Sequence, residues 1–471
     1  MKKLNLRGRE LEKIGFQRGE QISLTINIIH RNFRRSDKPE VIRLLKKLVK
    51  DPAQYKNDPR LGQISNILMS GEKSVPAQKQ EEIKLSNAPR DYIIYGQSEI
   101  EREALIQMES AMRLPITVRG ALMADAHSGY GLPIGGVVAT INTIIPYGVG
   151  MDIGCRMCLS VYNLPADFLE KNRSKLKSIL KENTRFGTDE FPGRKEHPVL
   201  ERKEFKEIRT IRELKDKAYS QLGTSGSGNH FVEFGISAIP VDNNEFGTSG
   251  GEYLAVLSHS GSRNFGASIA KHYTNIAKQK CYLPKGAQNL AWLNLNDEEG
   301  IEYWLAMNLS GDYAAANHQI IHEKISKSLG EKPIIRVENH HNFAWKEKLE
   351  DGTDVIVHRK GATPATTGAL GVIPGSMISP GFIIKGKGNR QSINSASHGA
   401  GRLMSRSKAK QHFTQKDLRQ TLEKAGVELM GGGLDESPGA YKDIHKIMAY
   451  QKDLVDIIGV FYPKIVRMSS D

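Results

Sequence analysis

The spacing of apolar residues changes along this chain, and the change falls near residue 90. Residues 39–51, PEVIRLLKKLVKD, repeat apolar side chains at the spacing of one helix face, with lysine and arginine largely opposite. The apolar positions are Val41, Leu44, Leu45, Leu48 and Val49. Residues 1–85 are therefore predicted to be mostly helical. Residues 73–84, rich in lysine and interrupted by Pro76, are typical of a loop or linker.

After residue 90, short runs rich in β-branched residues alternate with glycine-rich turns, which predicts strands separated by helices. Strands are predicted at residues 133–141, 158–164, 231–234, 253–257, 334–337 and 354–357. Helices are predicted at residues 166–182, 201–221, 265–280, 299–328 and 415–426. Regular βαβ spacing and internal repeats are both lacking. We therefore expect an α+β fold, with one large mixed core of central β-sheets and flanking helices in residues 86–471. The helical N-terminal region, residues 1–85, is expected to pack on this core.

Composition narrows the class of protein. Apolar residues make up 39% of the 471 residues and charged residues 25%, which is typical of a globular protein. No run of about 18 apolar residues occurs, so we expect no membrane span. The first residues lack the apolar segment of a secretory signal, which favours a cytoplasmic location. Three cysteines do not make a disulfide framework.

The net charge of +14 is unevenly distributed, because residues 1–90 hold 20 Lys and Arg against 10 Asp and Glu. A basic excess fits a polyanionic partner, since binding releases counterions from phosphates. It fits a solvated helix surface equally well, so the charge alone leaves both interpretations open.

Candidate chemistry lies in short segments that carry histidine, cysteine or aspartate, most of them flanked by glycine or serine. These segments are DIGC with Asp152 and Cys155, GSGNHF with His230, HSGSR with His259, HHNF with His340 and His341, and SHGAGR with His398. Carboxylate, thiolate and imidazole together are typical transition-metal ligands. His230, His259 and His341 fall at the ends of predicted strands, where side chains can point into a cleft. The pattern therefore predicts a metal pocket with a spare histidine for chemistry.

Some of the cysteines and histidines also fit other interpretations. Cys155 and Cys158 form a C-x-x-C, the spacing of redox pairs and zinc knuckles. A zinc knuckle needs a second such pair, and Cys158 opens the apolar run CLSVYNL, so a core position is favoured. The histidines in helical or charged surroundings are interpreted as structural: His30, His197, His272, His318, His322, His412 and His445.

Longer stretches around these residues resemble the RtcB family of RNA ligases. The matching stretches are MADAHSGYGLPIGGVVAT, VGMDIGC, GTSGSGNHFVE, HSGSRNFG, HHNF, HRKGATPA, IPGSM and SHGAGRLMSR, in the order found in the family. They span roughly residues 90–405. The family joins RNA 3′-phosphate or 2′,3′-cyclic phosphate ends to 5′-hydroxyl ends with GTP and manganese. The resemblance thus implies an RNA-ligating catalytic domain in residues 86–471, acting on tRNA halves or damaged RNA.

The resemblance also implies a role for individual residues. Two manganese ions would share the Cys155 thiolate, one held with Asp152 and His230 and the other with His259 and His341. His398 would be the nucleophile that takes GMP from GTP. The nucleotide contacts would be Asn229, His230, Phe231, Val232, Glu233, His341, Asn342, Pro374, Gly375, Ser376, Met377, Gly381, His398, Gly399, Ala400 and Gly401, with Asp125 as a further acidic residue of the site.

The family mechanism suits these residue types. A histidine nitrogen that attacks the α-phosphorus of GTP needs the phosphoryl charge neutralised, which metal ions do well. The small residues of HGAG let backbone N–H groups approach phosphate oxygens. Arg402, Arg359 and Lys360 are available as charge-assisted phosphate partners. The ligand types alone would suit zinc or copper as well, so manganese comes from the resemblance.

This chain departs from the family pattern at three positions. Arg156 follows the metal-binding cysteine where the family usually has glycine. Gly381 stands where a serine is common. Met468 aligns with the family's C-terminal lysine, which contacts the nucleotide, and Arg467 or Lys464 are possible substitutes.

Three alternatives to an RNA ligase stay open from the sequence. A relative with the same metals could cap or seal other ends, a non-ligating paralogue could only bind RNA, and a metal-dependent phosphatase would not use GTP. The sequence does not fix the oligomeric state.

Overall fold

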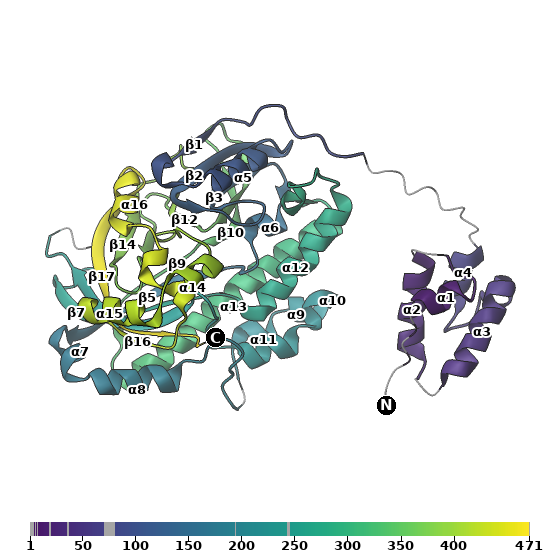
Figure 1. The fold of residues 1–471 in the computed structure, drawn as a ribbon, viewed down its shortest axis with the longest axis horizontal. Coiled ribbons are helices and arrows are strands. Elements are labelled where there is room, and N and C mark those ends of the chain that lie inside the picture. The colour runs from purple at the N-terminus through teal and green to yellow at the C-terminus, as the bar shows by residue number, and fades with distance from the viewer. Residues whose placement is uncertain are drawn as a thin grey trace. The chain divides into compact units, whose positions relative to one another are not determined.

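The chain divides into two compact units, residues 1–81 and residues 82–471 (Figure 1). The computed structural model describes residues 4, 6, 8–17, 20–34, 37–69, 81–193, 195–242 and 245–470. The predicted loop at 73–84 lies largely outside these residues, and its described part, 81–84, has no regular secondary structure. The expected packing of the N-terminal region on the core stays a prediction.

The N-terminal unit is helical. Its helices are α1 (Gly8–Glu12), α2 (Glu20–Asn32), α3 (Lys38–Lys50), the 3₁₀ turn η2 (Pro52–Tyr55) and α4 (Gly62–Met69). Helix α3 is the one predicted from residues 39–51, and its Val41, Leu45 and Leu48 are buried in the core of the unit. Leucine, isoleucine and phenylalanine from the other helices and from the N-terminal segment complete this core. The unit therefore has a hydrophobic core of its own.

The larger unit is built on an eight-stranded sheet and a five-stranded sheet. The larger sheet has the order β13-β14-β17-β6-β7-β5-β9, with β16 paired to β17. Its strands are β5 (Arg156–Pro165), β6 (Phe231–Ile239), β7 (Gly251–Ser260), β9 (Pro333–His340), β13 (Leu370–Ile373), β14 (Gly381–Gly386), β16 (Glu428–Met430) and β17 (Val455–Met468). The smaller sheet has the order β1-β2-β3-β11-β10 and consists of β1 (Tyr92–Ile94), β2 (Thr117–His127), β3 (Ile134–Thr140), β11 (Asp354–Lys360) and β10 (Asn342–Lys348). Two short ribbons pair β4 (Thr143–Ile144) with β8 (Leu293–Asn294), and β12 (Ala362–Pro364) with β15 (Ser395–Ser397).

Helices flank the sheets. They are α5 (Arg102–Met112), α6 (Pro146–Val149), α7 (Asp167–Lys171), α8 (Arg173–Asn183), α9 (Glu204–Glu207), α10 (Arg209–Arg212), α11 (Lys215–Gln221), α12 (Arg263–Lys280), α13 (Glu298–Leu329), α14 (Arg406–His412), α15 (Gln415–Ala425) and α16 (Ile444–Tyr450). Short 3₁₀ turns occur at η3 (Gln97–Glu99), η4 (Pro198–Glu201), η5 (Gln288–Leu290), η6 (Leu434–Glu436) and η7 (Pro438–Ala440). Helix α13 lies beside α12 (Figure 1) and, together with α8, packs on one face of the large sheet.

The central strands of the large sheet have two different faces, because successive side chains of a strand point to opposite sides. Cys158 is directly opposite Ser258 on β7, and its neighbour Met157 is opposite His259. The Cys158 side of the sheet packs against α13, where Ile321 and other apolar residues cover it. The other side, which carries His259, faces the candidate site.

The α+β fold expected from the sequence is confirmed, and each of the six predicted strands is present. The predicted helix at 201–221 is instead three short helices, α9 to α11. The pattern did not predict strands β2, β10, β14 and β17, although β14 and β17 are part of the large sheet and β2 and β10 of the small one. In the described part of the chain, no helix combines the length and the apolar content that crossing a bilayer requires.

Candidate active site

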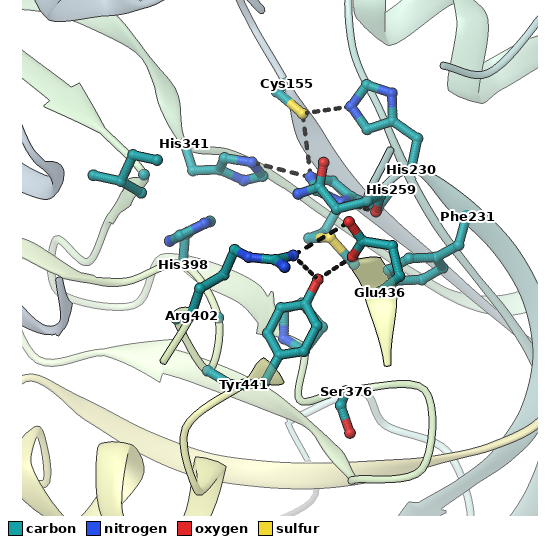
Figure 2. A pocket seen from close by; sticks show the side chains of 18 of the residues that line it. Cys155, His230, Phe231, His259, His341, Ser376, His398, Arg402, Glu436 and Tyr441 are labelled. Carbon is teal, nitrogen blue, oxygen red and sulfur yellow. Dashed lines mark hydrogen bonds and ion pairs between the residues drawn. The ribbon is translucent and has the colours of Figure 1, made fainter. Parts of the chain in front are cut away.

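A cavity of ≈ 410 Å³ lies where the ends of several strands meet, and it collects most of the residues predicted from the sequence. All of the predicted metal-binding residues and the predicted nucleophile line it. Figure 2 shows Cys155, His230, His259 and His341 gathered on one wall, with His398 beside His341. Of the predicted nucleotide contacts, Val232 and Asp125 do not line the cavity. The Val232 side chain lies on the opposite face of β6, in the core against α13, and Asp125 is buried behind His398.

The five predicted metal ligands form a continuous chain of contacts. His230 Nε2 lies 2.8 Å from Asp152 Oδ2 and 3.3 Å from Cys155 Sγ. The same sulfur lies 3.2 Å from His259 Nε2, which lies 3.2 Å from His341 Nε2. Sulfur, oxygen and imidazole nitrogen thus converge at separations that one or two cations could bridge. Cys155, His230 and His259 alone already offer three ligand atoms to a single ion.

Strand geometry brings these ligands together. Cys155 comes directly before β5, His230 directly before β6, and His259 is the next-to-last residue of β7. Strand β7 pairs with both β5 and β6, so its His259 lies between the other two ligands. The loop after β7 must also approach closely, because a Cβ on Gly261 would lie 2.1 Å from Asp152 Oδ1. Glycine is therefore required there for the carboxylate to reach the site.

Hydrogen bonding fixes which nitrogen of His259 faces the cluster. The Nδ1–H group of His259 donates to the Asn229 carbonyl at 3.0 Å, so the lone pair of a neutral ring is on Nε2. Burial, together with the nearby His230, lowers the pKa of His259 to about 3. Burial and His398 also lower the pKa of His341 well below its ordinary value. Both rings are therefore neutral near pH 7, the form that binds metals.

The two predicted ligands that can carry a negative charge, Asp152 and Cys155, differ in ionisation. Burial alone would raise the pKa of Asp152, but the adjacent His230 outweighs it and lowers this pKa to about 2. Burial and the Asp152 carboxylate raise the pKa of the Cys155 thiol well above its ordinary value. A thiolate at Cys155 therefore needs a cation, because a bound metal lowers the pKa of a coordinating thiol.

His398 is oriented by a buried carboxylate. Its Nδ1–H donates to Asp125 Oδ2 at 2.7 Å, and its backbone N–H donates to the same oxygen at 3.1 Å. Burial would raise the pKa of Asp125, yet His398 and Lys442 lower this pKa below its ordinary value. Asp125 is therefore an ionised acceptor, and because it is bonded to Nδ1 of His398, Nε2 is the ring nitrogen left free of this bond. The His398 ring lies 4.8 Å from the ring of His341, measured between centroids.

The loop after His398 is tightly packed against Asp125. Gly401 has φ +73°, a conformation that other L-residues rarely adopt, and a Cβ there would lie 2.0 Å from the Asp125 carbonyl oxygen. The Gly399 backbone N–H also donates to Asp125 Oδ2, at 3.3 Å. The small residues of SHGAGR thus keep the histidine and its carboxylate together.

The part of the cavity next to β6 and the end of β17 is mostly apolar and contains the buried carboxyl group of Glu233. Phe231, Met377 and Met468 line it together with Glu233, and burial raises the pKa of Glu233 well above its ordinary value. Neither Arg467 nor Lys464 lines the cavity, whereas Met468 does. The Arg467 guanidinium instead lies over the ring of Phe186, 5.9 Å from its centroid. The structure therefore brings no substitute for the family's C-terminal lysine from these two residues.

Arg402 was expected as a phosphate partner, whereas the cavity residues Arg406, Glu436 and Tyr441 were not predicted from the sequence. Arg402, Glu436 and Tyr441 form a hydrogen-bonded group on the wall opposite the histidines (Figure 2). Arg406 donates to Asn229 Oδ1 at 3.3 Å and pairs with Glu436 at 2.9 Å. Arg406 lies in SHGAGRLMSR, one of the stretches that resemble the RtcB family, whereas Glu436 and Tyr441 lie outside all of these stretches. Only the tertiary fold identifies them.

Lys360, expected as a possible phosphate partner, does line the cavity. Its Nζ donates to the Tyr130 carbonyl at 2.7 Å, and burial lowers its pKa to about 7. Arg359, the other candidate on this strand, points elsewhere: it is fully buried and paired with Glu347 at 2.6 Å. Alternation along β11 thus separates a cavity residue from a structural one.

Arg156 does not face the predicted metal site. It pairs with Glu338 at 2.5 Å and donates to the Gly311 carbonyl of α13 at 3.0 Å. These partners lie on the helix-covered face of the sheet, so the guanidinium points away from the Cys155 cluster.

A second group of the same residue types lies on that covered face. Cys158, His318 and His322 are buried and also offer three ligand atoms close together. Here each ring nitrogen has a partner: His322 contacts Ser160 and Ser258, and His318 contacts Ser258 and the Ser260 carbonyl, at 2.6–3.1 Å. None of the three lines the cavity. Satisfied hydrogen bonds favour a structural role for this group.

The sequence is similar to known proteins of one family over most of its length. The family model described as "tRNA-splicing ligase RtcB" matches residues 107–211 and 193–468. The chain is 32% identical over 391 residues to the RNA-splicing ligase RtcB of Escherichia coli strain K12, covering 76% of this chain and 92% of the relative. It is 31% identical over 420 residues to the tRNA-splicing ligase RtcB of Methanococcus maripaludis, covering 74% and 87%. It is also 31% identical over 397 residues to that of Thermococcus kodakarensis, covering 69% and 82%.

Proposed function

The chain belongs to the RtcB family, and we propose that it is an RNA ligase that uses GTP and manganese. In the proposed reaction it joins RNA 3′-phosphate or 2′,3′-cyclic phosphate ends to 5′-hydroxyl ends. The relatives are named RNA-splicing and tRNA-splicing ligases, which supports RNA ligation as the class of reaction. The observation that carries the proposal is the position of His398, held by Asp125 beside a chain of metal-ligand side chains in one cavity.

Two manganese ions fit the donor atoms on the cavity wall. Asp152, Cys155 and His230 would hold one ion, and Cys155, His259 and His341 the other. Neutral imidazoles, an ionised carboxylate and a thiol that needs a cation to ionise together form a suitable donor set. When bound, the ions would neutralise charge on the phosphoryl groups.

His398 is the proposed nucleophile for GTP. Its Nε2 forms a bond to the α-phosphorus while the bond from that phosphorus to the pyrophosphate oxygen breaks, and pyrophosphate leaves. Asp125 keeps the proton on Nδ1 and stabilises the positive charge that develops on the ring. The guanosine would occupy the rest of the cavity, along Asn229, Phe231, Glu233, Asn342, the 374–377 loop, Gly381 and the backbone of 399–401.

The guanylyl group then passes to the RNA. An oxygen of the RNA 3′-phosphate attacks the phosphorus on His398, the N–P bond breaks, and the 3′ end becomes an activated anhydride. The 5′-hydroxyl of the second RNA attacks the 3′-phosphorus, a phosphodiester forms, and GMP leaves. A 2′,3′-cyclic phosphate is first hydrolysed to a 3′-phosphate. Arg402, Arg406 and Lys360 are the cavity cations available to hold these phosphates.

A labelling experiment tests the proposal. The full chain is incubated with manganese and α-labelled GTP, and the label is examined for the acid lability and alkali stability of a phosphoramidate. Wild type should be labelled, His398→Ala should not, and His272→Ala, which changes an exposed histidine on α12, should be labelled like wild type. Labelled wild type should then join a 3′-phosphate RNA to a 5′-hydroxyl RNA.

Each other outcome points to a different function. Phosphate release from RNA ends without any label would indicate a metal-dependent phosphatase. RNA binding with neither label nor joining would indicate a non-ligating paralogue. Label without joining, but with GMP left on RNA or DNA 3′ ends, would indicate a capping activity.

A further inference from the structure

The N-terminal unit is distinct from the part of the chain that matches the RtcB family. Its residues 1–81 all precede residue 107, where the family match begins. It holds 18 Lys and Arg against 9 Asp and Glu, whereas residues 82–471 hold 49 against 44. The excess positive charge of the protein is therefore concentrated in a unit that the family's chemistry does not require.

Helix α3 presents part of this charge as one stripe. Arg43, Lys46, Lys47 and Lys50 follow one another at intervals of three and four residues, which places them on one side of the helix. All four are exposed, and Val41, Leu45 and Leu48 occupy the opposite, buried side. At ~1.5 Å of rise per residue, the stripe extends over about 10 Å.

These four side chains are not used within the unit. Among the described residues, none of them forms an ion pair or a side-chain hydrogen bond, in contrast to Lys38 of the same helix, whose Nζ lies 2.7 Å from Glu10. The acidic residue of the helix, Glu40, is in its first turn, before the stripe begins. Unpaired cations along one helix face create a local positive potential that attracts negatively charged partners.

We propose that this α3 stripe (Arg43, Lys46, Lys47 and Lys50) binds the phosphate backbone of the RNA substrate away from the end that is joined. The proposal rests on the proposed function, because it takes RNA as the substrate. A cavity of ≈ 410 Å³ is too small to hold a longer RNA, so most of such an RNA lies outside it. A basic stripe that contacts phosphates holds such RNA without reading its sequence.

A membrane surface is a poorer partner for the stripe. Amphipathic helices that lie in a bilayer interface insert an exposed apolar face. The apolar face of α3 is already buried in the core of the N-terminal unit, with Val41, Leu45 and Leu48 exposed by 1% or less. Only the charged side of the helix is therefore available to a partner.

The test compares two variants of the full chain. The first, R43Q/K46Q/K47Q/K50Q, removes the charge, and the second, R43K/K46R/K47R/K50R, keeps it at the same positions. Glutamine, lysine and arginine have similar helix propensities, so both variants should fold like wild type. Binding of a fluorescent single-stranded RNA with a 3′-phosphate is measured by anisotropy between 50 and 300 mM KCl.

The charge-removing variant should bind the RNA about 10-fold more weakly near 0.1 M salt, with a slope of log K against log salt shallower by about 2 to 3. The charge-keeping variant should match wild type in both quantities. Unchanged affinity and slope in the first variant would overturn the proposal and leave an acidic protein as the partner to test. Equal losses in both variants would also overturn it, since charge would not be the cause.

GTP labelling of His398 separates this proposal from the proposed function. All three proteins should be labelled equally, because α3 lies outside the cavity residues. An unlabelled wild type that still loses RNA affinity in the first variant would contradict the ligase mechanism and support the stripe. A labelled wild type whose RNA affinity does not respond to the first variant would contradict the stripe alone.

Discussion

Two groups of one cysteine and two histidines lie on opposite faces of strands β5 and β7, and their surroundings differ sharply. Cys155, His230 and His259 face the cavity, whereas Cys158, His318 and His322 face α13. In the covered group, serine hydroxyls and one carbonyl engage all four ring nitrogens. In the cavity group, His230 Nε2 and His259 Nε2 turn toward one sulfur, and His230 Nδ1 has no hydrogen-bond partner in the described structure.

The difference shows that residue type alone does not define a metal site. The hydrogen-bond partners of the histidines make the difference. Imidazoles whose nitrogens are already hydrogen-bonded to serines gain little from binding an ion. Imidazoles whose lone pairs converge beside a carboxylate gain much. Access matters as well, because only the cavity group is reached from solvent through a pocket. Substitutions in each group, and a change of pH, test this contrast.

Removing the sulfur of Cys155 should affect activity and metal content, whereas removing that of Cys158 should not. Cys155→Ala should lower the rate of RNA joining at least ~100-fold and reduce bound metal, because it removes the proposed shared ligand. Cys158→Ala should keep wild-type metal content and a rate within about threefold. Joining assays and metal analysis by mass spectrometry measure both quantities. Equal losses in the two variants would show that the groups are not functionally distinct.

Removing a histidine from the covered group should chiefly affect stability. His322→Ala leaves a cavity in the core and removes the hydrogen bonds of His322 to Ser160 and Ser258, so we expect a loss of about 2–4 kcal/mol in the free energy of unfolding. GTP labelling of His398 should persist at temperatures where the variant stays folded. His259→Ala should show the reverse pattern, with labelling lost and a smaller change in stability. Denaturant titration of both variants decides between these patterns.

Acid should destabilise the protein through the covered group. Burial lowers the pKa of His322 to about 3, from an ordinary value of 6.5. The unfolded chain therefore binds a proton at this residue that the folded chain does not, between about pH 6.5 and pH 3. Stability is fully present above pH 6.5 and is lost as the pH falls through this window. His322→Gln should make this loss shallower by up to about 1.4 kcal/mol per pH unit, measured by denaturant titration from pH 6.5 to 4.5. An unchanged slope would mean that His322 is not buried as a neutral ring.

The smallest effect is expected at Arg156. Arg156→Gln removes the pair with Glu338 and the bond to the Gly311 carbonyl, which should cost about 1–2 kcal/mol of stability. Metal content and joining rate should change by less than about twofold, because the guanidinium lies on the covered face. A large change in metal content would place this residue functionally with the cavity group.

The sequence predicted the cavity group better than its surroundings. His230, His259 and His341 could be assigned to strand ends because short apolar runs and glycines mark those ends. The pairing of β7 with both β5 and β6, which brings the ligands into contact, is a long-range property that local patterns do not contain. The position of Arg156 illustrates the same limit, since its face became clear only from its partners on β9 and α13.

Other features escaped prediction for identifiable reasons. Strand β17 carries Gly459 and Pro463, residues that usually argue against a central strand, yet it pairs with β6 and β14 through an irregular register. It supplies Val466 and Met468 to the cavity. Glu436 and Tyr441 become site residues only because the segment around η6 packs against Arg402.

The alternation along β5 and β7 also restricts how this protein can evolve. A one-residue insertion or deletion within either strand would turn every following side chain to the opposite side of the sheet, exchanging Cys158 with its cavity-facing neighbours. Point substitutions can accumulate there, but changes in length would break catalysis and packing in a single event. Length variation between homologous lineages should therefore be confined to connections such as the segment between β6 and β7, which joins the strand ends farthest from the ligands.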